Sequence, residues 1–297
     1  MKLTAAELRE RAREAREHYA RCDLCAHHCR VDRTRGPAGV CAEDDGLWLA
    51  GAGVHFGEEP QLGVPSGLVL IGGCNLACAY CETYDFSLER RGLVRTSPAE
   101  LAALLVDLQR RGARNANFVT PTHVLPALLE GLALAAEHDF SLPVVWNCGG
   151  YESLAALRLL EGIVDIYLPD AKYGDDAAAF ELSGCKGYTA ALRESLAEMV
   201  RQVGPSGVLV RHLVLPEGAA APAQVMQLIA SVSKEVAVNV MSQYRPVYRA
   251  GRFPVIGRGV SHAEVRAALD FARAAGLQQV LLDGRPLDHL PRSSGPR

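Results

Sequence analysis

The sequence predicts an α/β protein, a partial or full (β/α)6-type TIM-like barrel that carries a small cysteine-rich metal-binding segment at its N-terminal end. Between residues 65 and 285, short β-branched apolar runs alternate with longer helical stretches, and this repetition is typical of right-handed βαβ units. The strand candidates are continuously apolar, as in a parallel sheet covered by helices. About six such units favour a barrel over an open sheet.

The predicted elements follow one another regularly along the chain. Pro98 and Pro222 each open a helix, because proline suits the first helical position, and Thr4 is the expected N-cap of the first helix. Residues 47–56 are expected to form a short strand pair. The other strands are expected at residues 68–71, 116–120, 143–146, 164–168, 208–215, 236–241 and 280–282, and the helices at residues 4–20, 98–111, 124–138, 153–160, 190–203, 222–233 and 262–275.

A connection rich in Pro, Gly and Glu at residues 57–66 predicts a domain boundary. Residues 1–60 are therefore expected to form an N-terminal helix and a cysteine-rich segment that binds a metal or cluster. Residues 61–287 are expected to form the barrel, and residues 288–297 a loose tail. With 49% hydrophobic residues, the chain can bury a sizeable core.

Composition argues against several classes of partner. The net charge of −3 gives no reason to expect binding to nucleic acid or to an anionic membrane. No stretch of 18 apolar residues predicts a membrane span, and the first twenty residues are charged throughout, unlike a signal peptide. We therefore expect a cytoplasmic protein. In that compartment nine cysteines, an odd number, indicate metal or cluster ligands rather than disulfides.

Cys74, Cys78 and Cys81 are spaced C-x3-C-x2-C directly after a predicted strand, where barrels build their active sites. Ordinary cubane iron–sulfur sites supply four thiolates. Three thiolates leave one iron open, by the logic that separates catalytic from structural zinc sites. The preceding glycines, Gly72 and Gly73, allow a tightly bent loop. A zinc site with a fourth ligand and a group of buried thiols are the alternatives.

This motif resembles the signature of radical S-adenosylmethionine (SAM) enzymes, in which an aromatic residue, here Tyr80, precedes the third cysteine. The resemblance implies a [4Fe–4S] cluster whose open iron chelates SAM, with Tyr80 near the adenine. It further implies reductive cleavage of SAM to a 5′-deoxyadenosyl radical that abstracts hydrogen from a substrate. An electron donor such as flavodoxin or ferredoxin is then an expected partner.

Within this superfamily, residues 65–285 resemble the pyruvate formate-lyase activating-enzyme group and its PflX-like branch. The resemblance implies a radical SAM oxidoreductase that places a glycyl radical on a partner protein. Two other interpretations stay open: a radical SAM enzyme acting on a small molecule or another peptide, and a non-catalytic iron–sulfur or zinc redox module.

Polar residues at the strand ends are the expected cofactor contacts. The family's Gly-Gly-x-Pro turn is missing at residues 117–123, although Pro121 keeps a bend. Lys172 is expected to meet the SAM carboxylate or a substrate, and an ordinary surface ion pair with Asp170 is the alternative. Gln243 and Tyr244 are candidate substrate contacts. Asn147 is expected near the ribose, and a turn-forming role is the alternative. Asp170 and Lys172 are expected to project to one side, and Arg211 is expected to face the lumen while His212 faces away. The residues expected to bind the cofactor are Tyr80, Thr120, Asn147, Asp170, Lys172 and Arg211.

A second cysteine group has the spacing C-x2-C-x3-C-x11-C. Four ligands at this spacing predict a closed metal site, either zinc or an auxiliary [4Fe–4S] cluster. Either would stabilise a segment too short to build its own core. The pattern resembles one in the PflX-like branch. Its members are Cys22, Cys25, Cys29 and Cys41, whereas Cys148 and Cys185 are expected to be buried thiols.

Overall fold

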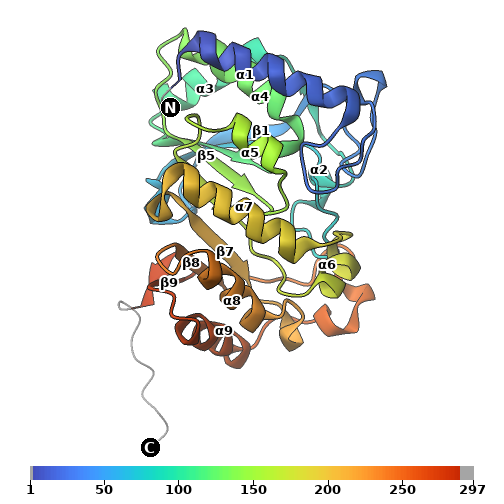
Figure 1. Cartoon of the computed structure of the whole chain (residues 1–297), viewed down its shortest axis with the longest axis vertical. Coiled ribbons are helices and arrows are strands. Elements are labelled where there is room, and N and C mark those ends of the chain that lie inside the picture. Colours follow the sequence, from blue (N-terminus) through green and yellow to red (C-terminus); the bar gives the residue numbers. More distant parts are fainter. Residues whose placement is uncertain (1–2, 288–297) are drawn as a thin grey trace, which may run out of the picture.

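The computed structural model describes residues 3–287 as a curved sheet with a layer of helices outside it (Figure 1). One sheet has the strand order β3-β1-β2-β4-β5-β6, and the other has the order β10-β9-β8-β7. The strands are β1 (Leu47–His55), β2 (Ser66–Ile71), β3 (Val94–Thr96), β4 (Asn115–Val119), β5 (Val144–Cys148), β6 (Ile166–Pro169), β7 (Leu209–Leu213), β8 (Ala237–Met241), β9 (Gln279–Leu282) and β10 (Arg285–Pro286).

The helices succeed the strands as the repeat predicts. In Figure 1 they run from α1 and α4 past α7 to α8 and α9, along the length of the sheet. Pro98 and Pro222 do open α3 and α8. The helices are α1 (Ala5–Glu17), α2 (Tyr84–Ser87), α3 (Pro98–Arg110), α4 (Leu125–Ala136), α5 (Leu154–Leu159), α6 (Asp176–Ser183), α7 (Tyr188–Val203), α8 (Pro222–Val232) and α9 (His262–Ala274).

The parallel strands β2, β4, β5, β6, β7, β8 and β9 form one curved series. Parallel ladders join β2 through β6 and β7 through β9. Two isolated parallel bridges, Tyr167–Val208 and Asp170–Arg211, connect β6 to β7. Among residues 3–287 no ladder joins the outer strands β3 and β10, so the barrel is partial. The predicted α/β class with a parallel sheet is confirmed. Of the two expected forms, a partial or a full barrel, the structure shows the partial one.

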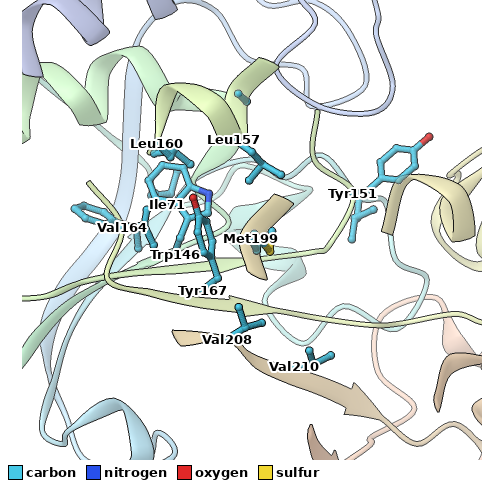
Figure 2. Packing of buried hydrophobic residues seen from close by; sticks show 14 of the residues in the cluster. Ile71, Trp146, Tyr151, Leu157, Leu160, Val164, Tyr167, Met199, Val208 and Val210 are labelled. Atoms are coloured by element: carbon cyan, nitrogen blue, oxygen red, sulfur yellow. The ribbon is translucent and has the colours of Figure 1, made fainter. Parts of the chain in front are cut away.

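Side chains alternate between the two faces of each strand. On β5, for example, Trp146 lies in the core under the helices, whereas its neighbour Asn147 faces the interior of the barrel. The outward-facing core is one continuous cluster that includes residues from α1 to α9, and Figure 2 shows part of it. The members labelled there are Ile71, Trp146, Tyr151, Leu157, Leu160, Val164, Tyr167, Met199, Val208 and Val210.

The connection at residues 57–65 fills one end of the barrel interior. Asn239 Nδ2 donates to Glu59 Oε1 at 2.8 Å, and Asn115 Nδ2 donates to the carbonyl oxygen of Leu62 at 2.9 Å. Leu62 also packs in a small cluster of apolar side chains from β5, β6, β7 and β9. A cavity is therefore left at the other end, where the strands have their carboxyl termini.

The structure differs from the predicted secondary structure in three places. Residues 47–56 do not form a strand pair, because β1 is a single strand that pairs antiparallel with both β2 and β3. Helix α6 was not expected. The expected helix at 190–203 begins earlier, at Tyr188, after Gly187 in the left-handed region at φ 62°.

The division at residue 60 stays a prediction, although α1 packs on α4 and β1 belongs to the same sheet as β2. The expected tail, residues 288–297, lies outside the described residues. Within residues 3–287, no helix has both the length and the apolar character needed to cross a bilayer.

Candidate functional site

The three-cysteine loop begins where β2 ends. Gly72 N donates to the carbonyl oxygen of Trp48 at 2.7 Å, which extends the pairing with β1 by one residue. Gly73 has φ +76° and lies against the buried side chain of Glu43. A Cβ there would approach Glu43 Oε1 within 2.3 Å, so the bend requires glycine. The loop then turns into the barrel mouth.

Cys74, Cys78 and Cys81 line a cavity at the carboxyl ends of the strands. Its empty volume, including the part open to solvent, is about 880 Å³, which admits a ligand far larger than a metal ion. All six residues expected to contact the cofactor line this same cavity: Tyr80, Thr120, Asn147, Asp170, Lys172 and Arg211.

A network of charged side chains crosses the cavity floor. Lys172 Nζ donates to Asp170 Oδ2 at 2.7 Å, and Arg211 Nε donates to Asp170 Oδ1 at 3.3 Å. Arg211 also donates to Asn147 Oδ1. Burial alone would raise the pKa of Asp170, but Lys172 and Arg211 hold that pKa below its ordinary value. Asp170 and Lys172 thus project to one side, as expected, and Asp170 is ionised beside two cations.

Sequence reasoning missed two carboxylates beneath this network. Glu58 and Glu59 lie 3.7 and 3.9 Å from Arg211 Nη1. Burial raises the pKa of Glu58, and the adjacent guanidinium opposes that shift. No local pattern indicated these residues, because they sit in a connection whose path depends on tertiary packing. Only Asp170 of the three carboxylates lines the cavity, whereas Glu58 and Glu59 approach Arg211 from the side away from it.

Sequence reasoning also missed the hydroxyl groups that contact Cys78. Ser183, the last residue of α6, donates from Oγ to Cys78 Sγ at 3.0 Å. Tyr173 lies 2.6 Å from Ser183 Oγ, and Tyr80 donates to the Tyr173 hydroxyl at 2.8 Å. This chain of hydroxyls fixes the positions of both Cys78 and Tyr80.

Thr120 occupies the place where the resemblance to radical SAM enzymes would put a glycine-rich turn. Its φ is +53°, which is uncommon for a β-branched residue and costs energy. Its N–H donates to the carbonyl oxygen of Asn147 at 2.8 Å, and its Oγ1 donates to the carbonyl oxygen of Gly73 at 3.4 Å. These contacts stabilise the strained turn at the cavity rim.

The remaining expected residues fall in different places. Gln243 lines the cavity, but Tyr244 is buried and donates from its hydroxyl to the carbonyl oxygen of Ile256 at 2.6 Å. The Tyr244 ring packs edge-on against Tyr80, with centroids 5.7 Å apart. Tyr244 therefore supports Tyr80 rather than facing a substrate.

Arg211 and His212 point to opposite faces, as expected. His212 is buried behind β7, with Nδ1 2.7 Å from the Ala171 carbonyl oxygen. Cys148 and Cys185 are both buried, although Cys148 also lines the cavity.

The four N-terminal cysteines line a second cavity, which they share with His28, Arg33 and His123. In the described part of the chain, no three His, Cys, Asp or Glu side chains converge on a point that one metal ion could occupy. In both groups the thiols therefore surround a shared space without meeting at one point. The members of this second group are Cys22, Cys25, Cys29 and Cys41.

Comparison with known proteins gives a curated sequence relative and several solved structures, one of which is described below. No family model matches the chain. The chain is 30% identical over 275 residues to the uncharacterized protein MJ0674 of Methanocaldococcus jannaschii, covering 90% of this chain and 78% of that protein. The chain belongs to the family of MJ0674.

The structure of a radical SAM methyltransferase from Sphaerobacter thermophilus superposes on this member of the MJ0674 family with a TM-score of 0.52. Sequence identity is 17%, and the match covers 95% of this chain and 93% of the methyltransferase. The likeness shows that the two chains share one fold over nearly their whole lengths. The α/β fold with a parallel sheet is therefore confirmed, whereas membership of the radical SAM superfamily and of its PflX-like branch belongs to the proposal below.

Proposed function

We propose that the protein is a radical SAM enzyme whose SAM-binding [4Fe–4S] cluster is held by Cys74, Cys78 and Cys81. The observation that carries the proposal is the shared cavity: three thiols on one wall and six polar or aromatic side chains around them. When bound, the cluster and SAM would supply one-electron chemistry, in which reductive cleavage yields a 5′-deoxyadenosyl radical that takes a hydrogen atom from the substrate.

The residues present fit such a cluster. Each thiolate of a cubane binds a different iron, so the three sulfurs should face a common space without meeting at one point, as they do here. The Ser183 hydroxyl donates to Cys78 Sγ, an interaction that stabilises a thiolate. Three ligands leave one iron free for a ligand from the cavity.

The polar side chains match the groups that SAM presents. The Lys172 ammonium suits a carboxylate, and the Asp170 carboxylate suits an α-amino group. The amide of Asn147 and the backbone at Thr120 offer acceptors at the same rim. Tyr80, held by Tyr173 and Tyr244, provides a rigid aromatic wall for a purine.

The charges around the cavity are compatible with a cationic ligand. Asp170 lines the cavity and pairs with Lys172 and Arg211, and Glu58 and Glu59 lie behind Arg211 and offset part of its positive charge. The site is therefore not strongly cationic, which suits the sulfonium of SAM. These residues position the ligand; hydrogen abstraction depends on the bound cofactor.

The proposal extends to the kind of substrate that reaches the cavity. The cavity opens to solvent, so a substrate can approach from outside, either as a loop of a partner protein or as a small molecule. Placing a glycyl radical on a partner, with electrons supplied by flavodoxin or ferredoxin, is the activity implied by the resemblance to activating enzymes. Methyl transfer, the activity named for the structural neighbour, is the competing outcome. A glycyl radical signal or a methylated product would separate them.

The decisive experiment measures SAM cleavage. The protein is reconstituted anaerobically with iron and sulfide, reduced with dithionite and given SAM, and 5′-deoxyadenosine is quantified. We expect formation that depends on the reductant and is retained in Cys185→Ala, which removes a buried thiol that lines neither cavity. A chain with an intact cluster whose electron paramagnetic resonance spectrum does not respond to SAM would contradict the proposal.

A further inference from the structure

The cavity lined by the four N-terminal cysteines contains a buried cation without an acidic partner. Arg33 is only 1% exposed. Its Nη1 lies 3.8 Å from Cys22 Sγ, and its guanidinium stacks 4.5 Å from the centre of the Tyr19 ring. Throughout residues 3–287, no Asp or Glu side chain forms an ion pair with it. Its remaining partners are the carbonyl oxygens of Glu43 at 3.1 Å, Asp44 at 2.6 Å and His123 at 2.6 Å.

Carbonyl oxygens satisfy the N–H groups of Arg33 but do not neutralise its charge. A buried guanidinium without a counter-charge is costly. Four neutral thiols would leave this cost in place. Four thiolates around a metal centre would remove it, because their negative charge exceeds the positive charge of the iron–sulfur core or zinc ion that they bind. The position of Arg33 therefore indicates an anionic centre in this cavity.

We propose that Cys22, Cys25, Cys29 and Cys41 hold a closed second [4Fe–4S] cluster and that Arg33 is its buried counter-charge. Zinc would require all four sulfurs within about 2.3 Å of one ion. The sulfurs line one cavity but do not converge in this way. They share this property with the three cysteines of the barrel loop, whereas a cubane places each thiolate on its own iron. Binding displaces the thiol protons.

The local backbone is shaped around these sulfurs. Gly39 has φ +74°, and a Cβ there would lie 3.3 Å from Cys29 Sγ, so a side chain would crowd both the turn and the ligand. Cys22 N donates to the carbonyl oxygen of Val31 at 2.8 Å, and Arg30 N donates to the carbonyl oxygen of Cys22 at 2.8 Å. This pairing closes the segment into a loop whose thiols face inward.

The segment also contacts the rear of the barrel loop, where His27 Nε2 lies 2.8 Å from the carbonyl oxygen of Asn75. His123, in the turn after β4, also contacts the loop, with Nε2 2.9 Å from the carbonyl oxygen of Gly72. Arg33 in turn donates to the carbonyl oxygen of His123. The second centre is thus joined to the first through short hydrogen-bonded connections, but its presence does not depend on SAM chemistry at the first.

The test counts metal at the second site alone. The full-length variant Cys74→Ala/Cys78→Ala/Cys81→Ala is purified anaerobically, and its iron, zinc and acid-labile sulfide are measured. We expect about four irons and four sulfides per chain. Adding Cys22→Ala to the triple variant should remove this iron and sulfide, whereas adding Cys185→Ala should leave them in place. If the triple variant does not fold, Cys22→Ala alone should lower the count from about eight irons to about four.

A folded chain with one zinc per molecule and no sulfide, or with no metal, would overturn the proposal. These outcomes are independent of the proposed function, because SAM cleavage is not measured.

The role of Arg33 is tested by comparing Arg33→Met with Arg33→Lys. Reduction adds negative charge to the cluster, so loss of the cation should lower its reduction potential in Arg33→Met, whereas Arg33→Lys should stay near the wild-type value. Retention of the cluster only in Arg33→Lys would support the same role. Equal potentials in the two variants, or loss of the cluster from both while they remain folded, would contradict it.

Discussion

One cysteine group lies on the barrel loop and the other in the segment that packs behind it, and the two differ in how their charge is balanced. The barrel group has three thiols and faces a cavity that opens to solvent, with Lys172 paired to Asp170 nearby. The N-terminal group has four thiols and a buried arginine that lacks any carboxylate partner among residues 3–287. An open site can leave its charges to be completed by a ligand, whereas a closed site must contain its own compensation. Under the two proposals above, the first group carries the chemistry and the second gives structural support.

The largest expected effect is at the barrel group. Cys74→Ala, Cys78→Ala or Cys81→Ala should each reduce formation of 5′-deoxyadenosine by about 1,000-fold or more, because loss of a ligand removes the cluster on which cleavage depends. The measurement is product per chain after anaerobic reconstitution. Normal cleavage by any one of the three would remove the distinction between the two groups.

Cys22→Ala should act first on metal content and stability. Loss of the closed centre leaves Arg33 buried without compensation, which we expect to cost several kcal/mol and to lower the melting temperature by roughly 5–10 °C. Thermal unfolding and metal analysis of the same sample check this, with Cys185→Ala as the matched loss of a buried thiol. Unchanged metal and unchanged melting would mean that the N-terminal group is not a metal site.

The third prediction concerns the strand behind Arg211. Burial lowers the pKa of His212 to about 4 from its ordinary value of 6.5. Because the folded state holds this imidazole neutral, its contribution is present above pH 6.5 and is lost as the pH falls towards 4. The loss should be about 3 kcal/mol.

Urea unfolding at pH 7, 6, 5 and 4 should therefore show a shallower decline for His212→Gln than for the exposed-residue control His262→Gln. Identical slopes for the two variants would show that His212 does not carry this pH dependence.

The smallest expected effect concerns Lys172 and tests whether it binds the carboxylate of SAM. Lys172→Met should weaken SAM binding about 10- to 100-fold, because a charge-assisted hydrogen bond contributes about 1.5–3 kcal/mol. Lys172→Arg keeps the positive charge and should lose less. Binding is followed from the SAM-induced change in the cluster's electron paramagnetic resonance spectrum. Equal affinity of Lys172→Met and the wild type would place the SAM carboxylate elsewhere.

Much of the architecture was predictable because local patterns determine it. Buried parallel strands are apolar runs in the sequence. Ser97 and Ser261 are the N-cap residues directly before α3 and α9, and each forms a capping box with a glutamate three residues later. The long strand β1 was mistaken for a pair because Gly51 and Gly53 suggest a turn. In the structure these glycines pair with β2 across a register shift.

Some residues around the cavity could be predicted from local sequence patterns, and others could not. Asn147, Asp170, Lys172 and Arg211 were predictable because the carboxyl ends of parallel strands meet at one edge of the sheet. Glu58, Glu59 and Ser183 were not, since each reaches the site from a connection or a helix end whose path depends on packing. Arg33 gave no signal either, because a single arginine in a basic segment reveals its burial only in three dimensions.

The antiparallel pairing of β1 with β2 has a consequence for how the protein matures. It brings the chain that leaves the N-terminal cysteine segment to the edge where the barrel loop begins, with Gly72 bonded to Trp48. That segment contacts the rear of the loop directly through His27, and indirectly through His123, whose carbonyl oxygen accepts a hydrogen bond from Arg33. Iron and sulfide for the proposed cluster would therefore have to enter through the open mouth of the cavity. SAM bound there first would obstruct them, so the proposed function implies that the cluster is loaded before SAM binds.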